Sequence, residues 1–176
     1  AIPHSHRDLM SFHLMVGKEK LIDNIGCGSY LDSTFSPRRD EIFEMTPRSK
    51  NTLLINGVGI VVGASAPTTV EDFGAFKGIR IDATKAMGNG FDSVASPFCA
   101  RIFIQLADRA ILIVDRIELS HASLAQAQFD LRQPASIEGD MATVPGKNES
   151  LHSALAASKP SVLQQAQAMP TWPSAP

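Results

Sequence analysis

The sequence predicts an all-β fold, an antiparallel β-sandwich, and three features of its pattern indicate this. Its apolar runs are short and rich in Ile, Val, Leu and Phe, and they are separated by Gly, Pro, Asn, Asp and Ser, which is typical of strands joined by turns. No stretch has the clean apolar stripe and the caps of a helix longer than about three turns. Several short strands at this spacing favour a sandwich of antiparallel sheets.

Turn signals place the strands in order along the chain. Gly17-Lys18 separates the first two strands, and Asn56-Gly57 is a tight-turn signal between the third and the fourth. The most regular hairpin turns at Asp108-Arg109, because Ile and Leu alternate on one face before this tip and an almost continuous apolar strand follows it. The predicted strands are residues 9–16, 20–23, 52–55, 58–62, 76–82, 102–106, 111–119, 124–131 (continuing the preceding meander) and a last short one near 150–155.

Length and composition exclude several classes of protein. The chain has 176 residues, of which 44% are hydrophobic, and this suits one domain with its own core. Its 16 Lys and Arg against 18 Asp and Glu lack the positive excess that non-specific nucleic-acid binding needs. No apolar run approaches the roughly 18 to 20 residues of a membrane span. Cys27 and Cys99 are too few for a disulfide framework, so one bridge and two free thiols both stay open.

We expect the chain to divide into a β-sandwich domain over residues 1–155 and a tail over residues 156–176. The tail carries Pro, Ala, Gln and Ser without any acidic residue, so we expect it to be poorly ordered. The first residues have neither the basic nor the apolar region of a signal peptide. Together these features favour a piece of a longer chain.

The first candidate site residues are His4, His6 and Asp8. In an extended backbone, residues two apart point to one face, so the two imidazoles would project together. Such a pair can bind a metal, or divide metal binding from proton transfer, and Asp8 could orient one ring through its second nitrogen. An exposed lead-in to the first strand is the alternative.

Asp23 and Tyr30 form a second candidate group. Asp23 ends an apolar strand, where a carboxylate can serve as a hard oxygen ligand. Gly26 and Gly28 permit close backbone approach, and Tyr30 follows on a loop where its phenol could donate or accept a proton. An ordinary glycine turn at a strand end is the alternative.

A basic loop is the third candidate group. Arg38, Arg39, Arg48 and Lys50 lie within a short stretch of a chain whose net charge is −2. This suits an anionic ligand such as a carboxylate-bearing sugar, which Arg can bind through two parallel hydrogen bonds. A solvated loop is the alternative.

Taken in order, these groups resemble the heparinase II/III-like polysaccharide lyases. The resemblance covers roughly residues 1–131, and residues 1–57 carry nearly all of its specificity. The matching residues are His4, His6, Asp8, Ser11, Phe12, Leu21, Ile22, Asp23, Gly26, Tyr30, residues 51–57 and the Val-Asp-Arg-Ile-Glu strand at 114–118.

In that family an α/α toroid precedes an antiparallel sandwich, and the cleft between them cleaves acidic polysaccharides by β-elimination. The resemblance implies that this chain is the sandwich portion without its toroid, inactive or nearly so by itself, and periplasmic or secreted. It also implies that His4 faces the substrate carboxylate. Tyr30 is a second catalytic candidate, and Arg38, Arg39 and Arg48 would bind flanking uronates of an acidic polysaccharide.

The resemblance further implies a zinc ion held by His6 and Asp23. The third ligand is normally a His directly before the Asn-Thr pair, but Lys50 stands there. An ammonium cannot coordinate a metal while it is protonated, and its charge repels the ion. We therefore expect weak zinc binding at most, and an ion pair between Lys50 and Asp23 could replace the metal.

Two other functions stay open. One is a non-catalytic carbohydrate-binding or scaffold sandwich with a degenerate metal site. The other is a metal-dependent hydrolase that uses His4 and His6, which predicts tight, stoichiometric zinc.

Overall fold

The computed structural model describes residues 6–26, 30–88 and 97–168, and within these ranges its regular structure is almost entirely β. The strands are β1 (Leu14–Val16), β2 (Glu19–Ile22), β3 (Leu53–Ile55), β4 (Thr68–Asp72), β5 (Lys77–Asp82), β6 (Phe98–Ala107), β7 (Ala110–Glu118), β8 (Ala125–Ala127), β9 (Ser136–Glu138), β10 (Met141–Pro145) and β11 (Ser150–Ala154). Three short 3-10 helices lie between β2 and β3: η1 (Arg39–Glu41), η2 (Phe43–Met45) and η3 (Pro47–Ser49). In the part of the chain that the structure describes, no helix has the length and hydropathy that crossing a membrane requires.

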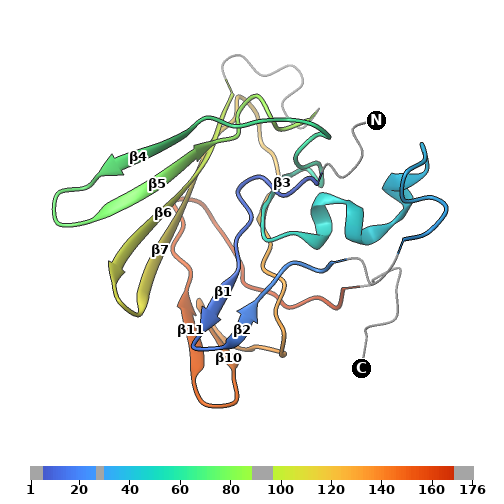
Figure 1. The fold of residues 1–176 in the computed structure, drawn as a ribbon. Coiled ribbons are helices and arrows are strands. Elements are labelled where there is room, and N and C mark those ends of the chain that lie inside the picture. Colours follow the sequence, from blue (N-terminus) through green and yellow to red (C-terminus); the bar gives the residue numbers. More distant parts are fainter. Residues whose placement is uncertain (1–5, 27–29, 89–96, 169–176) are drawn as a thin grey trace.

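The largest sheet is antiparallel and has the strand order β4-β5-β6-β7 (green to yellow in Figure 1). Its longest hairpin, β6–β7, turns at residues 108–109, as the sequence predicts. Ile102 lies opposite Val114 in this hairpin, and Arg101 lies opposite Asp115. The regular alternation of apolar residues therefore corresponds to the best-formed pair of strands.

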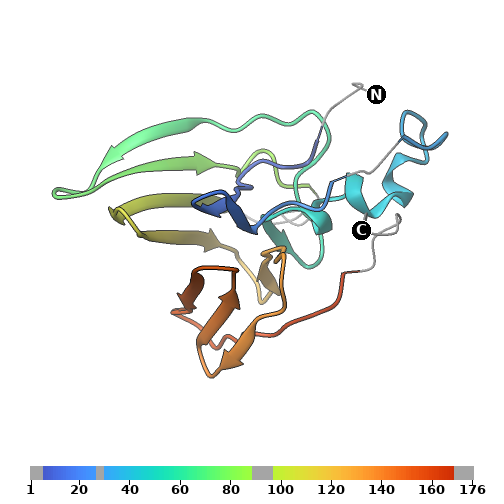
Figure 2. The same cartoon turned by 60° about the horizontal axis from the view of Figure 1, so that its bottom comes forward.

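Smaller antiparallel sheets complete the fold: β1-β2, β3-β8 and β11-β10-β9. Figure 2 shows the three-stranded sheet (orange to red) as a layer of its own beside β1 and β2. The turn between β10 and β11 contacts β2, where the Lys147 N–H donates to Glu19 at 2.8 Å. The same turn contacts the β6–β7 tip through an ion pair of Arg109 with Glu149 at 2.7 Å. The fold is thus all-β and antiparallel, in agreement with the predicted sandwich.

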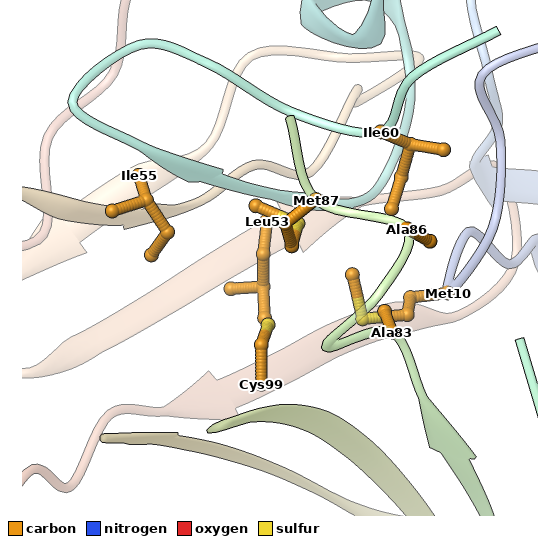
Figure 3. Packing of buried hydrophobic residues seen from close by; sticks show 8 residues of the cluster. All are labelled: Met10, Leu53, Ile55, Ile60, Ala83, Ala86, Met87 and Cys99. Carbon is orange, nitrogen blue, oxygen red and sulfur yellow. The ribbon is translucent and has the colours of Figure 1, made fainter. Parts of the chain in front are cut away.

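The hydrophobic core gathers where β3, the start of β6 and the segment before β1 meet (Figure 3). Small side chains allow these backbones to approach closely. The cluster consists of Met10, Leu53, Ile55, Ile60, Ala83, Ala86, Met87 and Cys99. Cys99 is a free thiol whose pKa burial raises to about 12, with the nearby Asp115 carboxylate acting in the same direction. Cys27 lies outside the described residues.

Next to this core lies Arg101, the largest fully buried side chain that the structure describes. Its guanidinium donates to both Asp115 oxygens at 2.7 and 2.9 Å. It also donates to the carbonyls of Met10 at 3.0 Å and of Asn51 at 2.7 Å. One side chain of β6 thereby ties β7 to two segments from the first third of the chain.

Several predicted strands differ in extent or in partner. The predicted strand 9–16 shrinks to β1, because Met10 has φ of 66° and interrupts the extended backbone. Asn56 and Gly57 both have positive φ and form the predicted tight turn, but residues 58–62 make only isolated bridges. The prediction that residues 124–131 continue the meander is wrong, since β8 pairs with β3. The sequence pattern did not predict β4, β9 and β10, which the structure contains. The division at residue 155 stays a prediction.

Candidate functional site

The candidate site is built around Asp23, which directly follows β2. Its backbone N–H donates to the carbonyl of Asp130 at 3.0 Å. One residue earlier, Ile22 forms an antiparallel bridge with Leu131. This pairing, between segments more than a hundred residues apart, fixes the position of the Asp23 carboxylate.

Three nitrogen-bearing side chains converge on the Asp23 carboxylate, whose side chain is 4% exposed. His13 Nδ1 lies 2.8 Å from Oδ1, and Lys20 Nζ lies 3.2 Å from Oδ2. Arg132 also donates to Oδ2. Burial by itself raises the pKa of Asp23, but the hydrogen bonds from Arg132 and Lys20 outweigh burial and hold that pKa below its usual value. Asp23 is therefore a buried, ionised carboxylate with two cationic donors on Oδ2 and an imidazole nitrogen beside Oδ1.

Lys50 directly follows η3 and is 4% exposed. Its Nζ donates to the carbonyls of Ile25 at 3.0 Å and of Glu44 at 2.9 Å. These bonds join the segment after β2 to η2. The sequence left open an ion pair of Lys50 with Asp23, whereas in the structure the cations bonded to that carboxylate are Lys20 and Arg132.

Asp130 is a second carboxylate close to Asp23. Burial raises the pKa of Asp130 to about 6, against the effects of a hydrogen bond from the Ile25 N–H and of the Lys50 charge, while the Asp23 charge raises it further. Its Oδ2 is buried without a hydrogen-bond partner. Asp130 therefore gains or loses its charge close to neutral pH.

The Asn51-Thr52 pair of the family pattern has a structural role here, and both residues are fully buried. The Asn51 N–H donates to Asn24 Oδ1 at 2.9 Å, and its side-chain amide donates to the Phe12 carbonyl at 2.8 Å. The Thr52 hydroxyl donates to the Leu9 carbonyl at 2.9 Å. The pair thus fixes the segment before β1 against β3.

The predicted catalytic and metal-ligating residues lie in different surroundings. His4 is outside the described residues, so its role stays a prediction. His6 is exposed, and the imidazole that contacts Asp23 belongs to His13. Tyr30 is 68% exposed, and its ring centroid lies 5.1 Å from that of Phe35. Its phenol is therefore on the surface of a loop, open to solvent.

The three predicted substrate-binding arginines also differ. Arg38 is exposed, and it donates to the Glu41 carboxylate from Nε at 3.0 Å and from Nη2 at 2.7 Å. Arg39 Nη2 lies 3.4 Å from the sulfur of Met45. Arg48 is exposed, and no ion pair is recorded for it within the described ranges.

Arg48 lines an open surface groove of about 590 Å³ between the 3-10 helices and the turn after β3. A second arginine of this groove, Arg7, contacts both oxygens of Asp40 at 2.7 Å, so its charge is already balanced. The groove is lined by Arg7, Asp40, Glu41, Phe43, Thr46, Pro47, Arg48 and residues 57–62. Arg48 therefore offers a cation to an anionic ligand in this groove.

The residues around Asp23 do not fit a zinc ion. Both carboxylate oxygens already accept hydrogen bonds or contact nitrogen, and two of the three partners are cations. Lys50 stands where the third ligand is expected. No group of three or more His, Cys, Asp or Glu side chains that could hold a metal ion occurs in residues 6–26, 30–88 and 97–168.

The sequence pattern did not predict that His13, Arg132 and Asp130 lie at this site. His13 comes opposite Asp23 because the β1–β2 register shifts by one residue between Met15 and Leu14, whereas a regular hairpin on the same turn would place Phe12 there. The other two come from a segment more than a hundred residues away, and no local pattern marks them.

Comparison with known proteins agrees with this architecture. The family model described as "Heparinase II/III-like, C-terminal" matches residues 2–169, which is nearly the whole chain. No curated protein matches the sequence. The chain therefore belongs to the heparinase II/III-like family and corresponds to its C-terminal domain.

Proposed function

We propose that this chain is the sandwich portion of a polysaccharide lyase that cleaves uronate-containing polysaccharides by β-elimination. The observation that carries the proposal is the family match over residues 2–169. In this proposal an N-terminal α/α toroid of the same protein completes the active cleft, and the protein acts in the periplasm or outside the cell.

The proposed reaction removes the proton at C5 of a uronate and expels the oxygen at C4. Because that proton is weakly acidic, the enzyme must neutralise the adjacent carboxylate as charge develops on it. His4 would contribute to this neutralisation at the substrate. Tyr30 is the candidate for a proton transfer, and its exposure on a loop leaves its hydroxyl accessible to a chain-like substrate.

Arg48 is the strongest of the proposed substrate-binding residues. Its exposed guanidinium lines the groove, and a planar guanidinium matches a uronate carboxylate in geometry. Arg38 and Arg39 would act further along the polysaccharide. The pairing of Arg38 with Glu41 must break before Arg38 can bind a second carboxylate.

A non-catalytic carbohydrate-binding or scaffold role is the second candidate. One observation favours it: the residues around Asp23 depart from the family's metal site, as expected of a degenerate relative.

Incubating the full-length protein with alginate, heparin and related polymers separates the two roles, because β-elimination creates an unsaturated uronate that absorbs ultraviolet light. We expect absorbance to grow with time, and to grow more slowly for Arg48→Ala. The matched control Arg116→Ala removes an exposed arginine on β7, outside the groove lining. Binding of the polymer without any growth in absorbance would support the scaffold role instead.

A further inference from the structure

A cluster of charged side chains around Asp23 joins chain segments that are far apart in the sequence. It comprises two carboxylates and three cations, namely Asp23, Asp130, Lys20, Lys50 and Arg132. Arg132 follows Asp23 by 109 residues, and Lys50 follows its acceptor Ile25 by 25 residues. Such connections are what a structural metal ion provides, because an ion ties together the segments that supply its ligands.

The charges of this Asp23 cluster disfavour a metal ion. Three cations face two carboxylates, so the group carries a net charge of about +1 when both carboxylates are ionised. A zinc ion would add two positive charges at the carboxylate that Lys20 and Arg132 already contact. Water hardly reaches the Asp23 carboxylate, which is 4% exposed, but it screens the outer sides of Lys20 and Arg132, whose side chains are 43% and 58% exposed.

The hydrogen bonds of the Asp23 cluster lead to the same conclusion. The Asp23 side chain and Lys50 are each only 4% exposed; Asp23 Oδ2 accepts from Lys20 and Arg132, and the Lys50 ammonium donates to two backbone carbonyls. A metal on Oδ2 of Asp23 would displace the donors of Lys20 and Arg132 and would set a dication beside these two cations. Separating a buried carboxylate from the cations that neutralise it is unfavourable.

We propose that this sandwich folds without a metal ion, that Lys50 and Arg132 supply the connections between separate segments that the family resemblance assigns to zinc, and that Lys20 helps to neutralise Asp23. The proposal depends on the geometry of the Asp23 cluster and not on lyase activity. An inactive scaffold and an active lyase would contain the same cluster, so failure of either proposal leaves the other standing.

The first test uses the unaltered protein. After dialysis against excess zinc and then metal-free buffer, we expect well below about 0.1 zinc per chain and a melting temperature that EDTA shifts by less than about 1 °C. A structural zinc would bind at one ion per chain, and its removal would lower the melting temperature by about 5 °C or more. Either of these two results would overturn the proposal.

The second test replaces Lys50 by Met, which keeps much of the side-chain length and removes the charge and both hydrogen bonds. We expect the melting temperature to fall by about 5 °C or more, and added zinc to leave it unchanged. Lys159→Met, at an exposed lysine, is the matched control and should melt like the unaltered protein. A Lys50→Met protein that melts like the unaltered one, or that zinc restores, would contradict the proposal. If this variant does not fold, the zinc content of the unaltered protein still tests whether the sandwich folds without a metal ion.

Discussion

Replacing Arg101 by Met would measure how much the buried ion pair next to the core contributes to stability. Arg101 is 0% exposed and makes four hydrogen bonds: two to Asp115, one to the Met10 carbonyl and one to the Asn51 carbonyl. Met fills a large part of the volume of Arg but donates none of these bonds. Two buried carbonyls and a carboxylate therefore lose their donor.

The size of the effect follows from these contacts. Breaking a buried ion pair by removing one partner costs about 3–5 kcal/mol of the free energy of unfolding. Asp115 is 18% exposed, so water reaches its carboxylate, and we expect the lower end of this range, about 3 kcal/mol. For a chain of this length that corresponds to a fall in melting temperature of about 6–12 °C.

Urea unfolding followed by circular dichroism, together with calorimetry, measures both quantities. Arg116→Met is the matched control, because Arg116 is exposed, pairs with the exposed Glu118 and lies 4.9 Å from the centre of the Phe98 ring, over which Met can also pack, so its loss should change the free energy by less than about 1 kcal/mol. Adding Asp115→Leu to Arg101→Met should recover part of the loss, because no unpaired charge remains. A free energy of unfolding for Arg101→Met within about 1 kcal/mol of that of the unaltered protein would show that the buried ion pair contributes little to stability.

Three further predictions concern single side chains. The pKa of Asp130 is raised to about 6, so the protonated side chain stabilises the folded protein fully at low pH, and this stabilisation is lost as the pH rises through about 6. The melting temperature of Asp130→Asn, measured relative to the unaltered protein, should therefore increase from about pH 5 to pH 7. A difference in melting temperature that does not change with pH would contradict this. In Gly59→Ala the added Cβ would lie 2.6 Å from Pro47 Cβ and 2.8 Å from Leu54 Cδ2, so we expect the free energy of unfolding in urea to fall by about 1–3 kcal/mol. An unchanged urea midpoint would argue against this close packing. The Cys99 thiol, buried and with its pKa raised to about 12, should react with iodoacetamide only after unfolding, and fast labelling of the native protein at Cys99, identified by mass spectrometry, would show that it is accessible.

The hairpins could be predicted from the sequence where the turn chemistry is local. Gly17, Asn56-Gly57 and the tip at 108–109 all turn where the residue types predict. The missed strand β4 contains Thr, Val, Glu and Asp, lies at the edge of its sheet and is mostly exposed, so it lacks the apolar alternation of a buried strand. β9 and β10 are short, and their pairing depends on partners that the local pattern does not specify.

The candidate site could be predicted only in part for the same reason. Asp23 could be singled out because it ends an apolar strand, but its partner Arg132 reaches it only through a pairing of distant segments. The wrong prediction for residues 124–131 has the same origin. β8 pairs with β3, about seventy residues earlier, rather than with the strand that precedes it. Local periodicity indicates that a segment is extended, but it does not identify the neighbouring strand.

The long-range hydrogen bonds also affect how this chain can reach its native state. The Met10 carbonyl finds its donor 91 residues later in Arg101, and the Asp23 carboxylate finds one of its donors 109 residues later in Arg132. On the ribosome, the N-terminal hairpin therefore emerges long before its anchors exist. Closing such large loops is entropically costly and slows folding, so the hairpin is expected to dock late, after most of the chain has been synthesised.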